Sequence, residues 1–160
     1  MTFRPDVIVT ASGWRKIKGA LAATSKAARQ TAKVAPLGEV TILLADDAAL
    51  QALNHQFRGR KKPTNVLSFP RGQGVGDVAL ALETVLAEAR AQGKTPIAHL
   101  SHLVVHGLLH LCGHDHMKKP EAARMETLEI AILLRLGYSN PYLSVPERRG
   151  ARKPPRTPRP

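Results

Sequence analysis

The chain has 160 residues, which suits a single domain, and 43% of them are hydrophobic, so it can bury a core. Lys and Arg number 24 against 12 Asp and Glu, and the net charge of +12 favours a polyanionic partner, either nucleic acid or an acidic membrane surface. A single cysteine, Cys112, excludes an intramolecular disulfide and a four-cysteine zinc ribbon.

Targeting segments are not predicted. No apolar run approaches the roughly 20 residues that a membrane-spanning helix needs. The N-terminus has Pro5 and Asp6 where a signal peptide would need an apolar core. We therefore expect a cytoplasmic protein that has no membrane partner.

In chain order, the pattern predicts alternating strands and helices. Short β-branched or apolar runs bounded by Pro, Gly or Asp predict four strands, over residues 7–10, 39–45, 64–69 and 77–81. Helical periodicity and capping residues predict five helices, over residues 13–33, 47–56, 83–92, 97–111 and 121–136. This order favours an α+β fold, with a small mixed β-sheet of about four strands covered by helices.

The domain organisation follows from the composition of the C-terminus. We expect one domain over residues 1–146, whose last helix faces the core with Met125, Leu128, Ile132 and Leu136. Residues 147–160 hold five Arg, one Lys and four Pro and nothing that could pack. They are predicted to form a disordered basic tail.

The first predicted helix has a basic stripe. Five of its six basic residues fall within about 80° of arc, and these are Arg15, Lys18, Lys26, Arg29 and Lys33. Two interpretations are open, a solvated helix face and a surface that follows a phosphate backbone.

Six of the seven histidines lie between His99 and His116. His106 and His110 are four residues apart, so on a helix their rings stack on one face within reach of one ion. Gly113 offers a left-handed turn that ends the helix, after which His116 can approach the same ion. Three imidazoles with an open fourth position are typical of catalytic zinc, so the spacing predicts a zincin-like metal helix with one zinc ion per chain.

The residues next to these histidines indicate which reaction a bound metal would support. Zinc proteases with the same spacing carry a general-base Glu after the first histidine, and here that residue is Gly107, which would leave space beside the metal. His99 and His102 are expected to pack or to support the ligands. Asp115 could hold a ligand imidazole, accept a proton from zinc-bound water, or cap a turn. Cys112 is expected to be a small buried residue.

A second polar cluster lies between a predicted helix and a predicted strand. Arg58, Arg60, Lys61 and Lys62 crowd a loop that contains Gly and Pro, beside Phe57. Such loop residues are usually solvated, but the planar fork of Arg suits phosphate. Arg60, Lys61 and Lys62 are therefore candidate RNA-binding residues. Ser68 has no G-x-S-x-G around it, so a serine hydrolase is not predicted.

The segments LNHQFRGRKKPTNVLSFP, GDVALA, HLSHLVVHGLLHLCGHDH, METLE and GYSNPY resemble the YbeY family of bacterial zinc-dependent, single-strand-specific endoribonucleases. The resemblance runs from about residue 39 to 142. It implies that His106, His110 and His116 bind zinc, and that Arg58 is the functional arginine. It further implies maturation of the 3′ end of 16S ribosomal RNA, ribosome quality control, and ribosomal or GTPase partners.

The expected reaction is metal-assisted hydrolysis of an RNA phosphodiester, with Arg58 neutralising charge on the phosphate. The base is left open between zinc hydroxide, Asp115 and the RNA's own 2′-hydroxyl. Two other functions remain: a zinc metalloprotease-like hydrolase, which Gly107 and the positive charge disfavour, and a non-catalytic ribosome-assembly module with structural zinc. Nickel or another divalent ion could occupy the same ligands.

Overall fold

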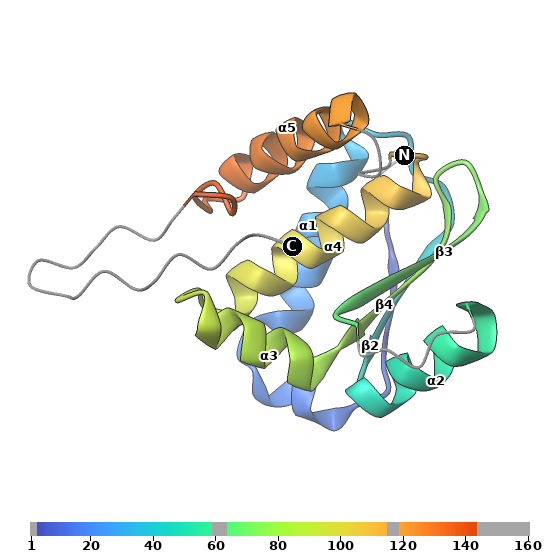
Figure 1. Ribbon diagram of the computed structural model, residues 1–160, viewed down its shortest axis with the longest axis vertical. Coiled ribbons are helices and arrows are strands. Elements are labelled where there is room, and N and C mark those ends of the chain that lie inside the picture. The colour runs from blue at the N-terminus through green and yellow to red at the C-terminus, as the bar shows by residue number, and fades with distance from the viewer. Residues whose placement is uncertain (1–2, 59–63, 115–118, 144–160) are drawn as a thin grey trace, which may run out of the picture.

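The computed structural model of the protein describes residues 3–58, 64–114 and 119–143 (Figure 1). In chain order, the elements are β1 (Asp6–Val9), the 3₁₀ helix η1 (Ser12–Lys16), α1 (Ala20–Ala32), β2 (Val40–Ala45), α2 (Asp47–Arg58), β3 (Val66–Gly72), β4 (Val75–Ala81), α3 (Leu82–Ala91), α4 (Pro96–Leu111) and α5 (Lys119–Arg135). This order confirms the predicted α+β fold.

The four strands form one mixed sheet in the order β1-β2-β4-β3. β1, β2 and β4 are parallel, and β3 pairs with β4 as an antiparallel hairpin. Side chains alternate between the two faces of the sheet, as the pleat requires. Ile42 and Leu44 of β2 belong to the larger core, whereas Ala45 and the partly buried Leu43 belong to a smaller one.

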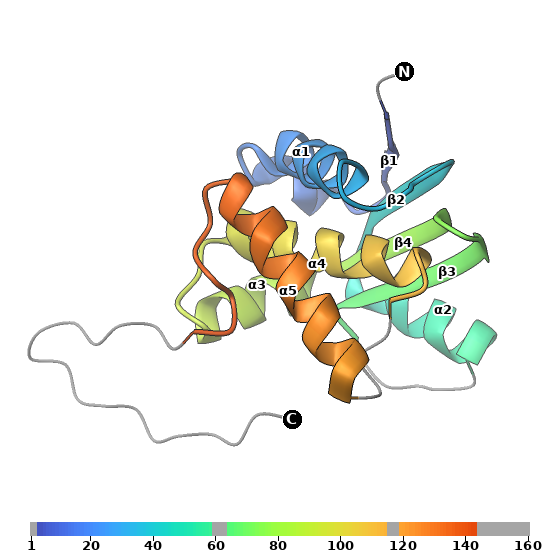
Figure 2. The ribbon, with the colours of Figure 1, turned by 90° about the horizontal axis from the view of Figure 1, so that it is seen from above.

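The helices cover the two faces unequally. α1, α4 and α5 contribute to the larger core on one face, together with Val85 of α3. α2 lies across the other face, where Leu50 packs against Leu67 and Ala79 (Figure 2). α4 lies in the middle of the molecule, with β3 and β4 on one side of it and α1, α3 and α5 around its other sides (Figures 1 and 2). Both of its long sides are therefore buried, which agrees with its predominantly apolar sequence.

The prediction of one helix over residues 13–33 is wrong. The segment is divided into η1 and α1, and Gly19 between them has a left-handed backbone with φ of 83°. Trp14 causes the division, because its buried indole Nε1 donates to the carbonyl of Ala45 at 2.7 Å, which fixes η1 under the end of β2. The five basic residues therefore share no single helix face, and only Lys26, Arg29 and Lys33 remain together at the end of α1.

The inward face of α5 was predicted correctly. Met125 and Ile132 are fully buried, and Leu128 and Leu136 pack partly buried against the same core. In the described ranges, no helix combines the length and the apolar character that crossing a membrane would demand.

Candidate metal centre and active site

α4 carries two of the predicted metal ligands, and both of its ends are fixed. At its start, the Thr95 hydroxyl accepts a hydrogen bond from the Ala98 amide at 3.1 Å, a standard N-cap. At its end, Gly113 adopts φ of 88°, which terminates the helix. The Gly74 amide, from the β3–β4 turn, donates to the Leu111 carbonyl at 2.8 Å. The hairpin thus holds the end of the helix where His110 lies.

His106 and His110 lie one turn apart on α4, as predicted, and their rings meet edge to face, with 73° between the ring planes. The two Nε2 atoms are 3.2 Å apart, and the ring centroids are 4.7 Å apart. Two nitrogen ligands of a tetrahedral zinc ion, each about 2.05 Å from the metal, are about 3.3 Å apart. The observed separation therefore fits two ligands of one such ion.

A buried carboxylate lies behind His106. Glu129 of α5 is only 1% exposed, and its Oε1 accepts from His106 Nδ1 at 3.3 Å. Its Oε2 accepts from His102 Nε2 at 2.6 Å, and the Tyr142 hydroxyl donates to both oxygens at 3.0 Å. A carboxylate can only accept, so His106 must carry a proton on Nδ1. In the neutral ring, this leaves Nε2 unprotonated, as a metal ligand requires.

The charges in this network follow from burial and hydrogen bonding. Burial by itself would raise the pKa of Glu129, but the hydrogen bonds from His102 and His106 outweigh it and lower the pKa to about 2. Burial lowers the pKa of His102, against the opposing effect of Glu129. The arrangement near neutral pH is therefore an ionised Glu129 beside a neutral His102.

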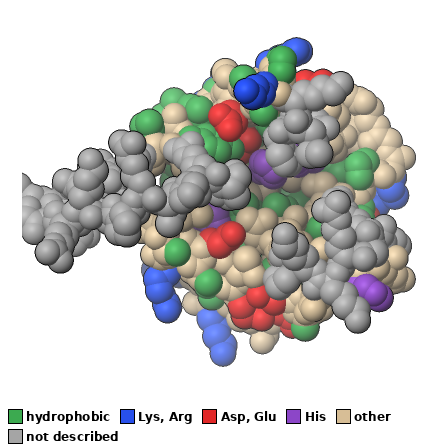
Figure 3. Space-filling view, viewed as in Figure 1, with side chains coloured by type: hydrophobic (Ala, Val, Ile, Leu, Met, Phe, Trp, Pro, Cys, Tyr) green, Lys and Arg blue, Asp and Glu red, His purple; other side chains and the backbone are tan. Residues whose placement is uncertain are grey.

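A cleft of about 400 Å³ opens over these histidines. It lies between α4 and β3, and its lining residues are Thr64, Asn65, Val66, Ser68, Pro70, His106 and His110. Histidine side chains reach the surface in a hollow of this face (Figure 3). The imidazole pair is therefore accessible to a substrate.

Asn65 lines this cleft and is hydrogen-bonded to α3. Its amide Nδ2 donates to Glu88 Oε1 at 3.0 Å, and the same oxygen accepts from His99 Nε2 at 2.9 Å. The hydrogen bond from His99 is the main cause that lowers the pKa of Glu88, so the carboxylate is ionised near neutral pH. This arrangement fixes an amide oxygen and an amide nitrogen beside the histidines.

Gly107 serves close packing, and the expectation that it leaves space beside the metal is wrong. A Cβ at this position would lie 2.7 Å from Val78 Cγ1, 3.2 Å from Ser68 Oγ and 3.2 Å from Val66 Cγ2. The sheet fills that space. Ser68 donates to the Gly107 carbonyl at 2.9 Å, so this serine is a structural contact between β3 and α4.

The structure describes only part of the predicted site. His106 and His110 come together, whereas His116 and Asp115 lie outside the described residues. The same holds for Arg60, Lys61 and Lys62. Arg58 is the last residue of α2, and the chain re-enters the described range at Thr64, on the rim of the cleft. Among the described residues, no group of three potential metal ligands occurs.

The supporting residues were predicted only in part. His99 and His102 hold carboxylates, as expected of packing or supporting histidines, and Cys112 is buried as predicted. Glu129 and Tyr142 were not predicted to take part in the site. One feature of the sequence could have pointed to Glu129. It lies one turn from Met125 and Ile132 on the core face of α5, where burial of an unpaired carboxylate would destabilise the fold, so a partner is needed.

Comparisons with known proteins identify the relatives of this chain. A family model described as "Endoribonuclease YbeY" matches residues 8–137. A protein of that name from Azorhizobium caulinodans is 46% identical over 152 residues, which cover 86% of this chain and 94% of the relative. The chain belongs to the YbeY family. A second relative of that name, from Paramagnetospirillum magneticum, is 53% identical over 116 residues, which cover 65% of this chain and 71% of the relative.

The fold of the family is also represented among solved structures. The solution structure of TM1509 from Thermotoga maritima aligns with a TM-score of 0.58 and 24% identity, and covers 91% of this chain and 99% of that one. This likeness supports the α+β fold alone. Membership of the YbeY family favours a ribonuclease over the protease that the histidine spacing also allowed.

Proposed function

We propose that this protein is a metal-dependent endoribonuclease that hydrolyses single-stranded RNA in the cleft between α4 and β3. The observation that carries the proposal is the pair of facing Nε2 atoms of His106 and His110, 3.2 Å apart, with His106 Nδ1 donating to buried Glu129. This arrangement orients two imidazoles for one ion at the floor of an open cleft. A family described as endoribonucleases supports RNA as the substrate.

The proposed ligands of one zinc ion are His106, His110 and His116. Imidazole nitrogens suit zinc, and three protein ligands leave one position for water or substrate. When bound, zinc supplies a Lewis acid that polarises a phosphate oxygen and activates a water molecule. Glu129 holds His106 in the tautomer that this site needs, and His102 and Tyr142 hold Glu129 in turn.

The other residues bind and orient the RNA. Arg58, at the end of α2, is proposed to neutralise the charge that develops on the phosphate oxygens as a P–O bond breaks. Arg60, Lys61 and Lys62 would bind neighbouring phosphates. Asn65 presents amide atoms at the rim of the cleft, where they can bond to a ribose or a base. Asp115 is a candidate base, and the 2′-hydroxyl of the RNA is the alternative nucleophile to water.

The biological setting is part of the same proposal. We place the activity in the cytoplasm, on ribosomal RNA, with maturation of the 3′ end of 16S rRNA and ribosome quality control as its purpose. Ribosomal proteins and an assembly GTPase are the proposed partners. We also propose that residues 1–146 form the one catalytic domain and that residues 147–160 add a basic tail.

The test compares two substrates and two metal states. Purified protein is incubated with a single-stranded RNA and with a duplex of the same sequence, before and after removal of metal by a chelator. We expect cleavage of the single strand only, its loss with chelator, and its recovery when zinc is restored. Cleavage that survives complete metal removal would exclude metal dependence, and absence of cleavage with one tightly bound metal would favour the structural-zinc alternative.

A further inference from the structure

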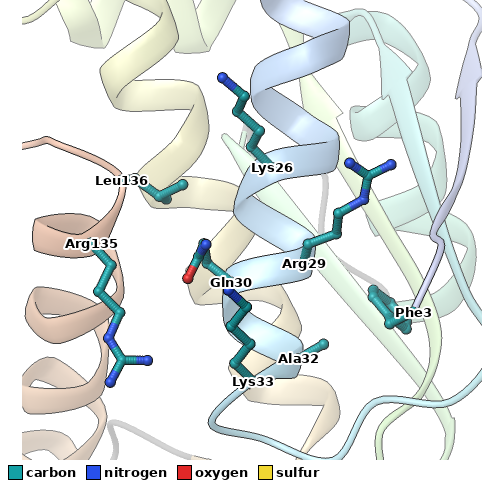
Figure 4. A pocket seen from close by; sticks show the side chains of 8 residues that line it. All are labelled: Phe3, Lys26, Arg29, Gln30, Ala32, Lys33, Arg135 and Leu136. Carbon is teal, nitrogen blue, oxygen red and sulfur yellow. The ribbon is translucent and has the colours of Figure 1, made fainter. Parts of the chain in front are cut away.

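A second concave surface lies over the end of α1, and we call it the basic groove. It has a volume of about 580 Å³ and shares no lining residue with the histidine cleft. Its cations are Lys26, Arg29 and Lys33 of the α1 region and Arg135 at the end of α5. Figure 4 shows Arg135 on one side of α1 and Phe3 on the other.

The four cations of the basic groove have no counterions in the described structure. Lys26, Arg29, Lys33 and Arg135 are all exposed, and none forms an ion pair with a described carboxylate. No acidic side chain is among the described residues that line the groove. The positions 26, 29 and 33 lie on one helix face, so their charges repel one another. A bound polyanion would relieve this repulsion.

The apolar part of the groove indicates which polyanion fits. Phe3 packs partly buried against the core, and its ring lies at the end of the groove on the side of α1 away from Arg135 (Figure 4). A fixed aromatic ring offers a stacking surface to an unpaired base, and such stacking tolerates any base. Gln30, between the cations, adds an amide that can bond to a base or a ribose. A purely anionic ligand would make no use of the ring.

We propose that the basic groove binds a single-stranded segment of the RNA substrate, with phosphates on Lys26, Arg29, Lys33 and Arg135 and a base against Phe3. The segment would lie outside the cleaved region, because the groove and the histidine cleft are separate surfaces. The inference rests on the proposed function, since RNA is the substrate there. A long RNA would then bind both the histidine cleft and the basic groove, whereas a short RNA would bind only the cleft.

The experiment measures cleavage of a long and a short single-stranded RNA as a function of salt. The test variant replaces Lys26, Arg29, Lys33 and Arg135 by Gln. A matched control removes four exposed cations that do not line the groove: Arg15, Lys16, Lys18 and Arg90, each replaced by Gln. Both variants have the same net charge, so a difference in KM between them shows that the location of the removed cations matters. Circular dichroism and metal content confirm that both remain folded and loaded.

We expect the groove variant to raise KM for the long RNA at low salt by at least about tenfold, with kcat unchanged. The slope of log KM against log salt should flatten by up to about 3, because each lost phosphate contact removes about 0.7. KM for the short RNA should stay the same in both variants. Phe3→Leu should raise KM for the long RNA several-fold and leave competition by inorganic polyphosphate unaltered.

Two results would overturn the inference. Equal effects of the groove variant and the control would show that only total charge matters. Normal behaviour of the groove variant on long RNA would assign the cations to another partner, such as an acidic protein. If the wild type cleaves neither RNA, the proposed function fails, and direct binding of the long RNA to the same variants still decides the groove.

Discussion

At the scale of single residues, Glu129 is the group on which the orientation of the site depends. It joins His102, His106 and Tyr142 through its two oxygens, and it is buried away from water. Such outer partners fix the tautomer and the ring orientation of a ligating histidine. Glu129 is therefore a positioning residue, which acts through His106.

Replacing Glu129 by Gln should weaken metal binding. The amide offers one acceptor oxygen where the carboxylate offers two, so it cannot hold both His102 and His106 as before. We expect the affinity for zinc, measured by chelator competition, to fall about 10–100-fold. Glu126→Gln, at an exposed position of the same helix, is the matched control and should bind zinc normally. Wild-type affinity in Glu129→Gln would reduce Glu129 to a packing residue.

Arg58→Lys tests the proposed phosphate contact. Lysine keeps the charge but lacks the planar fork of donors. If Arg58 binds the phosphate in the transition state, turnover of single-stranded RNA should fall at least about tenfold while zinc content stays normal. Arg90→Lys, on α3, serves as the control substitution. Unchanged turnover in Arg58→Lys would leave Arg58 a surface charge.

At the scale of elements, the position of α4 on the sheet depends on Gly107. Alanine is normally better than glycine inside a helix by about 0.5–1 kcal/mol. At this position its Cβ would approach the buried Val78 to 2.7 Å. We expect Gly107→Ala to lower the free energy of unfolding by about 1–3 kcal/mol, measured by urea denaturation.

A double variant shows whether the contact with Val78 is the cause. In Gly107→Ala with Val78→Ala, the added methyl occupies the space that the valine leaves. The combined loss of stability should therefore be smaller than the sum of the two single losses. A stabilised Gly107→Ala protein would mean that α4 and the sheet are farther apart than described.

The elements themselves were largely predictable, because their local patterns agree with the packing. Apolar periodicity and the flanking Thr95, Pro96 and Gly113 set the limits of α4, and the spacing of His106 and His110 places both rings on one face. The first helix was predicted wrongly because its interruption depends on Trp14 bonding to a distant strand. Glu129 was missed for the same reason, since its partners lie 23 and 27 residues away.

At the scale of the whole molecule, the net charge of +12 is expected to strengthen the binding of RNA. Residues 148–160 carry six positive charges and lie outside the described residues. If they bind RNA without specificity, deleting them should flatten the salt slope of RNA binding by up to about 4 and weaken binding at low salt. Zinc content and unfolding free energy should stay at wild-type values. An unaltered slope would assign the tail's charge to another purpose.

The most direct test of the account is the metal content of His110→Ala. Two imidazoles rarely hold zinc against competing chelators, so this variant should lose stoichiometric zinc and, with it, cleavage of single-stranded RNA. His55→Ala, at an exposed position of α2, is the matched control and should keep one zinc per chain and full activity. Full zinc occupancy in His110→Ala would contradict the proposed metal centre.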